Sequence, residues 1–102
     1  MLNINTEGFD WDSGNRSKCR SHGLTPSQIE EFFKQKIYIA PDYKHSQKET
    51  RYLAAGQSQK GRPMFVVFTL RENVEGLLIR PISARYMHEK EAKKYEEENT
   101  ET

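Results

Sequence analysis

Apolar residues in the first third of the chain have the spacing of a helix. Ile29, Phe32 and Phe33 follow the i, i+3, i+4 pattern that places apolar side chains on one helical face. Thr25 precedes them as an N-cap, followed by a proline suited to the first helical position and by a glutamine that completes a capping box. The pattern predicts a helix that begins after Thr25 and ends near residue 35.

A shorter helix is predicted upstream of this one. Asp12 can cap a helix that continues through Arg20 and ends at His22 and Gly23. A glycine in this position readily takes the left-handed conformation, and a histidine in the last turn can interact with the terminal carbonyls. The two predicted helices therefore meet at Gly23.

After residue 35 the pattern becomes typical of strands, separated by a turn at 59–62 and a loop at 71–76. The segment 63–70 is apolar on both faces, which predicts a central strand covered by helices on at least one side. Pro81 lacks a backbone donor and therefore predicts a sheet edge or a bulge within the last strand. The expected strands cover residues 36–40, 51–58, 63–70 and 77–83.

The end of the chain has the composition of a helix over residues 85–98, with one side suited to rest on the sheet. The expected fold is a small α+β domain with two N-terminal helices, a three- to four-stranded, mainly antiparallel sheet and a C-terminal helix. We expect one domain over residues 9–95, an extension at 1–8 and an acidic tail at 96–102, whose last residues should fray. A sheet with helices on one face leaves its other face or its edge free for a ligand or partner.

Composition narrows the class of protein. A chain of 102 residues, 34% of them hydrophobic, has room for one core. It has neither an apolar run long enough for a membrane span nor the pattern of a signal peptide, so we expect a cytoplasmic protein. Cys19 is the only cysteine, the histidines are scattered, and no carboxylate cluster of the kind that holds Mg²⁺ is evident. We therefore expect no disulfide, metal or cofactor.

Charge is distributed unevenly along the chain. The net charge is +1, but four of the 15 acidic residues lie in the last seven positions. Residues 1–94 contain 16 basic and 11 acidic side chains, a net charge of +5. A mildly basic body suits a phosphate-rich ligand or an acidic partner, although many soluble domains have a similar charge.

Four segments in order carry a family resemblance: residues 9–12 leading to His22-Gly23, residues 51–56, residues 62–69 and residues 79–87. Together they resemble the BrnT family, toxin components of type II toxin–antitoxin modules, over roughly residues 9–95. The sequence Ile82-Ser83-Ala84-Arg85 before a helix is the most specific of these motifs. The resemblance implies an endoribonuclease with a RelE-like fold. It also implies a ribbon-helix-helix, BrnA-like antitoxin that binds operator DNA and assembles with the toxin as a heterotetramer.

The implied reaction, attack by the RNA's own 2′-hydroxyl, needs a proton acceptor, cations near the phosphorus and an acid for the leaving oxygen. Arg80 and Arg85 are candidate phosphate clamps, because a guanidinium can bind two phosphate oxygens at once. Arg51 opens another strand and could face the same surface. Each has a structural alternative: Arg80 could pair with Glu49 or Asp12 to hold the sheet. Glu49 is a candidate base, or an ion-pair partner that orients Arg51.

Other side chains also have two interpretations. His22 could carry a proton, because histidine changes charge near neutral pH, or it could stabilise the end of its helix. His88 could project over the site from the final helix or be solvated. Tyr86 could stack on a base or close the core. Arg62, Tyr86 and His88 are the candidate RNA-binding residues.

The function that these observations favour is a metal-independent endoribonuclease toxin that cleaves messenger RNA, inhibits translation and growth, and is neutralised by its antitoxin. The alternative is a non-catalytic interaction module that serves only as the partner of a DNA-binding antitoxin. A general nucleic-acid-binding domain would need a larger basic excess. The acidic tail is a solvated helix end, a contact for a basic antitoxin, or a mimic of RNA that dampens activity.

Overall fold

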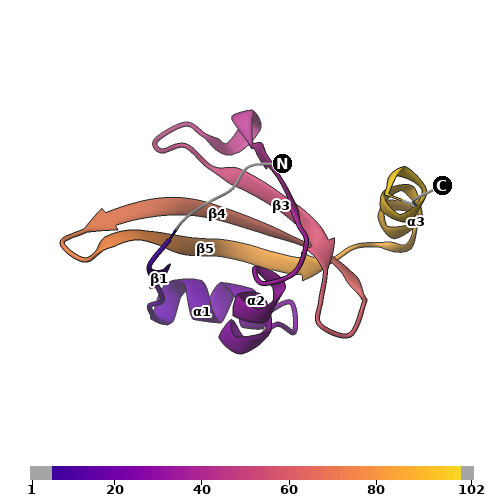
Figure 1. Ribbon diagram of the computed structural model, residues 1–102, viewed down its shortest axis with the longest axis horizontal. Helices are drawn as coiled ribbons and strands as arrows, with labels where there is room; N and C mark the ends of the chain where they lie inside the picture. Colours follow the sequence, from indigo (N-terminus) through magenta and orange to yellow (C-terminus); the bar gives the residue numbers. More distant parts are fainter. Residues whose placement is uncertain (1–5, 100–102) are drawn as a thin grey trace.

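The computed structural model describes residues 6–99, with the side chain of His45 left out. Within this range five strands form one sheet in the order β1-β5-β4-β3-β2, with a parallel β1–β5 pair and three antiparallel pairs. The predicted α+β class is confirmed, and β1 is a strand that the sequence pattern did not reveal. In chain order the elements are β1 (Gly8–Phe9), α1 (Ser13–Arg20), α2 (Pro26–Phe32), β2 (Tyr38–Pro41), a 3-10 turn (Tyr43–His45), β3 (Tyr52–Gln57), β4 (Pro63–Asn73), β5 (Gly76–Tyr86) and α3 (Glu89–Glu98) (Figure 1).

Both N-terminal helices begin at the predicted caps. The Asp12 side chain accepts a hydrogen bond from the Asn15 N–H, and the Asn15 side chain accepts one from the Asp12 N–H. Thr25 and Gln28 form the same reciprocal box at the start of α2. Gly23 has a φ of +81°, as expected of a left-handed residue after a helix. However, α1 ends at Arg20, so His22 lies in the turn after the helix rather than in its last turn.

The hydrophobic core lies between α1, α2 and one face of the sheet (Figure 1). Ile29 and Phe32 are fully buried and Phe33 packs against the core, which confirms the predicted stripe. Cys19 is also fully buried, and burial raises the pKa of its thiol, so it acts as a small apolar core residue. The strands contribute Ala54, Met64, Val66, Phe68, Ile79 and Ala84.

Several predicted boundaries were wrong near the long hairpin. The segment 71–76, expected to be a loop, contains the end of β4, a tight turn and the start of β5, with Asn73 paired to Gly76. At the other end, β5 continues to Tyr86, and the Met87 N–H donates to the Pro63 carbonyl. These backbone pairs extend both strands, so α3 begins at Glu89 instead of residue 85. α2 ends at Phe32, before the expected residue 35.

The predicted irregularity at Pro81 is a β-bulge. Val67 pairs with Ser83 and Phe68 pairs with Pro81, so Ile82 has no partner on β4. The Asn15 side-chain amide donates to the Pro81 carbonyl at 2.8 Å and to the Asp10 carbonyl at 3.0 Å, joining α1 to the bulge and to the segment after β1. In a regular strand, residues an odd number of positions apart point to opposite faces. The extra residue therefore places Arg80 and Arg85 on one face.

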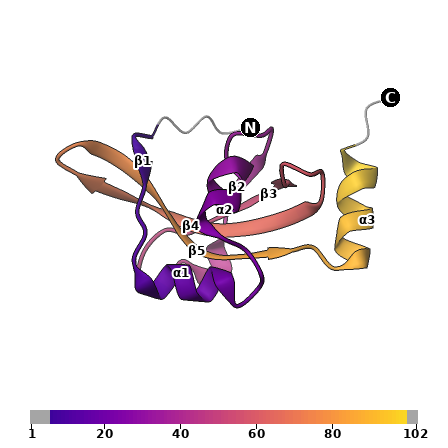
Figure 2. The ribbon, with the colours of Figure 1, turned by 90° about the horizontal axis from the view of Figure 1, so that it is seen from below.

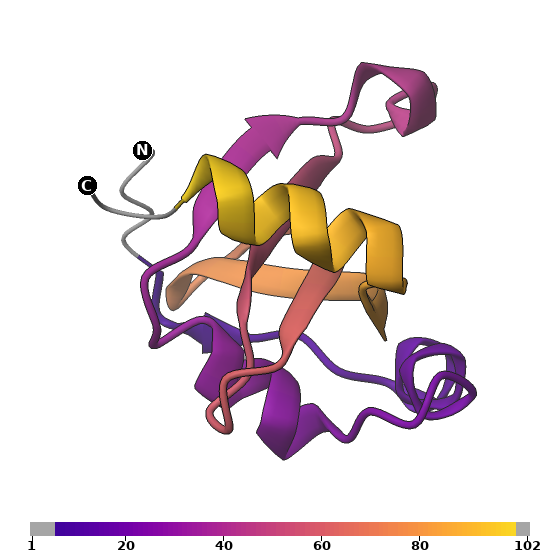
Figure 3. The same ribbon diagram turned by 90° about the vertical axis from the view of Figure 1, so that its right-hand side faces the viewer.

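This second face of the sheet is covered by neither α1 nor α2; we call it the open face. It carries Phe65, Val67 and Thr69 of β4, whose neighbours Met64, Val66 and Phe68 point into the core. α1 borders the open face beside β5, and α3 lies across one end of it (Figures 2 and 3). No helix among residues 6–99 is long and apolar enough to cross a membrane.

Candidate active site

Two arginines of β5 project from the open face. Arg80 pairs with Thr69 and Arg85 pairs with Phe65 in the β4–β5 ladder. Four ladder steps separate the two arginines, which corresponds to roughly 13 Å along the strand at ~3.3 Å per residue. They can therefore hold phosphates of different nucleotides on one extended strand.

Two hollows on this face adjoin at Lys18, and we call them together the basic groove. The first, of about 490 Å³, contains His22 and Arg85 over an apolar floor of Leu53, Phe65 and Val67. The second, of about 260 Å³, contains Arg51, Arg80, Glu49 and Arg71. The structure thus brings all five candidate catalytic residues to one surface: His22, Glu49, Arg51, Arg80 and Arg85.

Arg85 is held by a carboxylate from α3. Its two terminal nitrogens lie 2.8 and 3.0 Å from the two Glu91 oxygens, and its guanidinium lies 5.2 Å from the centre of the Phe65 ring. The Arg85 hydrogen bonds, together with the His88 N–H at 2.8 Å, lower the pKa of Glu91 to about 2. The carboxylate is therefore ionised at neutral pH. It occupies Arg85 in the bidentate way that a phosphate would.

Arg80 has the structural partner that the sequence suggested. Its Nη2 lies 2.8 Å from Asp12 Oδ2 and its Nη1 lies 3.5 Å from Asp10 Oδ2. The Asn15 backbone N–H and the Arg80 side chain lower the pKa of Asp12. Glu49 is not the partner of Arg80. It also does not orient Arg51, as we had expected, because its carboxylate lies 3.4 Å from Arg71 instead.

Three other basic side chains of the groove have no such partner among the residues that the structure describes. Within residues 6–99, the side chains of Lys18, His22 and Arg51 form no hydrogen bond or ion pair. They can therefore bind an anionic ligand without first breaking an internal contact. No three His, Cys, Asp or Glu side chains in the described part of the chain are placed to hold a metal ion.

The chain matches a known protein family over most of its length. Residues 11–91 match the family model described as the ribonuclease toxin, BrnT, of type II toxin–antitoxin systems. The chain belongs to the BrnT family. It is therefore a ribonuclease toxin of a type II toxin–antitoxin system, and a toxin of this type implies a cognate antitoxin. No curated protein matches the chain significantly. The BrnT match contains every residue of the basic groove, from Gly14 to Glu91.

The candidate RNA-binding residues of this BrnT chain lie outside the groove. The Arg62 guanidinium lies 3.8 Å over the ring of Tyr86. Tyr86 pairs with the buried Met64 and packs against the core, as its structural interpretation predicted. His88 is the N-cap of α3, and its Nδ1 lies 3.4 Å from Glu91. Only His88 approaches the groove, through the carboxylate that holds Arg85.

Three residues that shape the BrnT groove were not predicted as site residues from the sequence: Asn15, Lys18 and Glu91. For Lys18 the sequence does contain a signal, because Gly14 and Lys18 are four residues apart and therefore lie on the same side of α1, and both line the groove. Asn15 and Glu91 act through contacts with the bulge and with Arg85. These pairings depend on the register of β5, which no local pattern specifies.

Proposed function

We propose that the chain is a metal-independent endoribonuclease that cleaves messenger RNA in the basic groove and thereby inhibits translation and growth. The observation that carries this proposal is the bulge at Ile82, which directs Arg80 and Arg85 to the face that also holds Arg51 and His22. The proposed substrate places the activity in the cytoplasm.

The groove supplies groups suited to each part of the reaction. The RNA 2′-oxygen attacks the adjacent phosphorus, and the bond from phosphorus to the 5′-oxygen breaks, leaving a cyclic phosphate and a 5′-hydroxyl. Arg51 and Arg85 stabilise the charge that develops on the phosphate oxygens. His22 accepts the proton of the 2′-hydroxyl, with Glu49 as the second candidate base, and the base then gives this proton to the leaving 5′-oxygen.

The test is cleavage of a long single-stranded RNA by the purified chain in the presence of a chelator. We expect cyclic or 3′-phosphate ends from the native chain, and no products from the Arg80→Ala/Arg85→Ala double variant. His22→Gln should lower the cleavage rate by about 10²–10⁴-fold. Equal cleavage by the native and double-variant proteins would indicate a contaminating nuclease or a site elsewhere. A chain that cleaves neither free RNA nor RNA on ribosomes would contradict the proposal.

The partner we propose is a ribbon-helix-helix, BrnA-like antitoxin that covers the basic groove. Toxin and antitoxin would form a heterotetramer, and the antitoxin would carry the contact with operator DNA. Expression of the chain alone should arrest growth, and coexpression of the neighbouring open reading frame should restore it. Normal growth with intact RNA after induction would contradict the toxin activity.

A non-catalytic interaction module is the second candidate function. The observation that favours it is that Arg80 and Arg85 are both engaged by carboxylates of the same chain. The Arg80→Ala/Arg85→Ala variant separates the two functions. Retained antitoxin binding with RNA decay identical to that of the native chain would favour the module.

A further inference from the structure

The open face continues from Arg85 across the sheet as one row of side chains. Arg85 pairs with Phe65, Phe65 with Ala55, and Ala55 with Tyr38, so the row crosses β5, β4, β3 and β2. It begins with a guanidinium and ends with an aromatic ring that is 38% exposed. At ~4.8 Å between neighbouring strands, its ends are roughly 14 Å apart.

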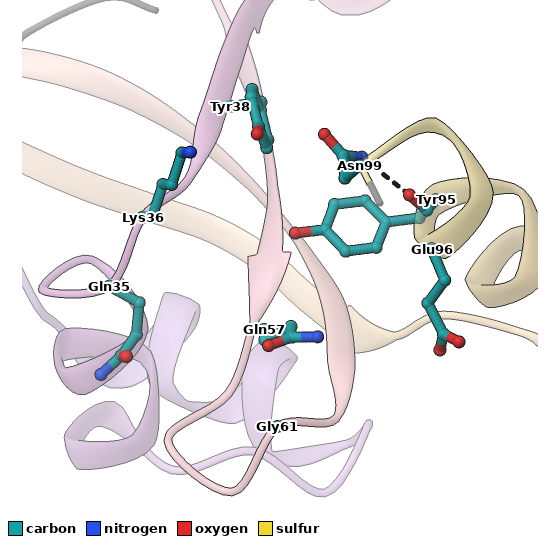
Figure 4. A pocket seen from close by; sticks show the side chains of 8 residues that line it. All are labelled: Gln35, Lys36, Tyr38, Gln57, Gly61, Tyr95, Glu96 and Asn99. Carbon is teal, nitrogen blue, oxygen red and sulfur yellow. Dashed lines mark hydrogen bonds between the residues drawn. The ribbon is translucent and has the colours of Figure 1, made fainter. Parts of the chain in front are cut away.

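Helix α3 lies along this row (Figure 3). Glu91 binds Arg85 at one end of the row. Tyr95, one helical turn later, points towards Tyr38 at the other end, and their ring centroids are 6.5 Å apart at 70° (Figure 4). Together the two tyrosines border a hollow of about 760 Å³, with Gln57 and Asn99 on its rim (Figure 4).

The contact between α3 and the sheet is weak. No residue of α3 is buried, although the helix has ten residues. A helix of this length is marginal in water without tertiary support. Its attachment therefore depends on side-chain contacts, among them those of Glu91 with Arg85 and of Tyr95 with Tyr38.

We propose that the row from Arg85 to Tyr38 is a nucleotide subsite for single-stranded RNA, and that α3 occupies it as an internal mimic. Glu91 takes the place of a phosphate on Arg85, and Tyr95 takes the place of a base on Tyr38. RNA that enters the subsite displaces α3. The inference rests on the proposed ribonuclease function and adds to it the location of one nucleotide and a competitor for it.

The chemistry of both ends supports this assignment. A carboxylate and a phosphate both present two oxygens to the guanidinium fork, so one can replace the other. Tyrosine rings stack on unpaired bases, and the side-chain amide of Gln57, which stays on the sheet, offers both donors and an acceptor to a base edge. Because Arg85 and the His88 N–H keep the pKa of Glu91 near 2, this carboxylate stays ionised at neutral pH. A competing anion must displace it.

The test compares substitutions on the helix with substitutions on the sheet. The probe is a 2′-O-methyl RNA oligonucleotide, which has no free 2′-hydroxyl to attack, and its dissociation constant is measured by fluorescence anisotropy. Removing the mimic should strengthen binding: we expect about two- to fivefold tighter binding for Glu91→Gln and for Tyr95→Ala, the range for an exposed pair. Removing the subsite should weaken binding by about fivefold or more for Arg85→Ala and Tyr38→Ala.

Matched controls remove the same groups elsewhere. Glu97→Gln removes the same charge from α3 without touching Arg85, and Tyr43→Ala removes a tyrosine that is 84% exposed. Glutamine at position 91 still fits the capping box, so α3 keeps its N-terminal turn. Both controls should bind the oligonucleotide as the native chain does.

Competition predicts tighter RNA binding for substitutions on α3 and weaker RNA binding for substitutions on the sheet. A purely structural role of α3 does not predict these opposite effects. The proposal that α3 mimics RNA is contradicted if Glu91→Gln and Tyr95→Ala bind the oligonucleotide more weakly than the native chain does, or only as tightly as Glu97→Gln does. This holds even when the native chain cleaves RNA. If the native chain neither binds nor cleaves RNA, the proposed function fails, and the subsite fails with it.

Hydrogen exchange gives an independent measurement. Bound ligands usually protect amides, but an α3 displaced by the oligonucleotide should fray, and its amides should exchange faster. Slower or unchanged exchange in α3 on saturation with the oligonucleotide would contradict displacement.

Discussion

Asn15 shows how one buried polar residue can determine the geometry of a site. Its side-chain oxygen accepts a hydrogen bond from the Asp12 N–H at the start of α1. Its side-chain NH₂ donates to the carbonyl of Asp10, just after β1, and to the carbonyl of Pro81 in β5. Only 6% of Asn15 is exposed. Because Pro81 is next to the bulged Ile82, this residue links the position of α1 to the direction of Arg80.

Substitution of Asn15 should therefore affect both stability and cleavage. Asn15→Ala leaves two carbonyls without their donor and should lower the free energy of unfolding by about 1–3 kcal/mol, measured by urea denaturation. Ser17→Ala, on an exposed position of the same helix, should stay within about 0.5 kcal/mol of the native chain. An Asn15→Ala protein as stable as Ser17→Ala would show that the bulge does not need this contact.

Glu91 gives the protein a defined response to acid. Its pKa falls from the usual 4.5 to about 2 in the folded chain. The Arg85–Glu91 pair therefore contributes fully above about pH 4.5, and its contribution is lost as pH falls towards 2. The stability difference between the native chain and Glu91→Gln should shrink as urea denaturation is repeated from about pH 5 down to about pH 2. If the difference in the free energy of unfolding stays constant over this pH range, the Arg85–Glu91 pair does not stabilise the folded chain as described.

At the scale of elements, local signals in the sequence determined the helix starts and the irregular strand. Asp12 and Thr25 cap their helices as predicted, because capping depends on side chains within one turn. Pro81 marked the bulge, because a missing N–H disturbs any ladder. The ends of β4 and β5 and the existence of β1 were missed, since they depend on pairing between distant segments.

The candidate site could be predicted only in part for the same reason. Arg80, Arg85 and Arg51 were named from their residue type and from the family resemblance, and they do share a surface. Arg62 and Tyr86 lie in the same motifs but stack on each other away from the groove, because Tyr86 falls on the core side of β5. Spacing in the sequence alone does not show on which face of the sheet a side chain lies once a bulge has shifted the alternation along the strand.

Packing of β3 against α2 should be sensitive to one added methyl group. A Cβ at Gly56 would lie 2.8 Å from Ile37 Cγ2 and 3.1 Å from Phe32 Cε1. Gly56→Ala should therefore lower the free energy of unfolding by about 1–3 kcal/mol through overpacking. The neighbouring exposed Gln57→Ala should have little effect in the same urea titration. Equal stability of the two variants would show that this contact is loose.

At the scale of the whole molecule, position matters more than net charge. The chain has a net charge of only +1, yet six basic side chains line the groove beside three carboxylates. The basic ones are Lys18, His22, Arg51, Arg71, Arg80 and Arg85, and the carboxylates are those of Asp42, Glu49 and Glu91. A single-stranded nucleic acid releases counterions in proportion to the phosphates that such a surface neutralises. The RNA binding that we propose for the groove therefore does not require a strongly basic protein around it.

The salt dependence of RNA affinity should report this surface. Each phosphate contact on single-stranded RNA contributes about −0.7 to the slope of log K against log salt concentration. Lys18→Ala should reduce the slope by about this amount, because the Lys18 side chain forms no hydrogen bond or ion pair within residues 6–99 and lines both hollows. Arg16→Ala, on α1 but outside the groove, should leave the slope unchanged. Equal slopes for the two variants would place the RNA elsewhere.

The most direct test of a catalytic basic groove is the single-turnover rate of RNA cleavage in chelator by Arg51→Ala beside Arg16→Ala. Arg51 is the better probe because its side chain forms no hydrogen bond or ion pair within residues 6–99, so its loss should leave the fold intact. If Arg51 stabilises the developing charge, its removal should slow cleavage by about 10²–10³-fold, while Arg16→Ala keeps the native rate. A folded Arg51→Ala protein that cleaves as fast as Arg16→Ala would contradict the account.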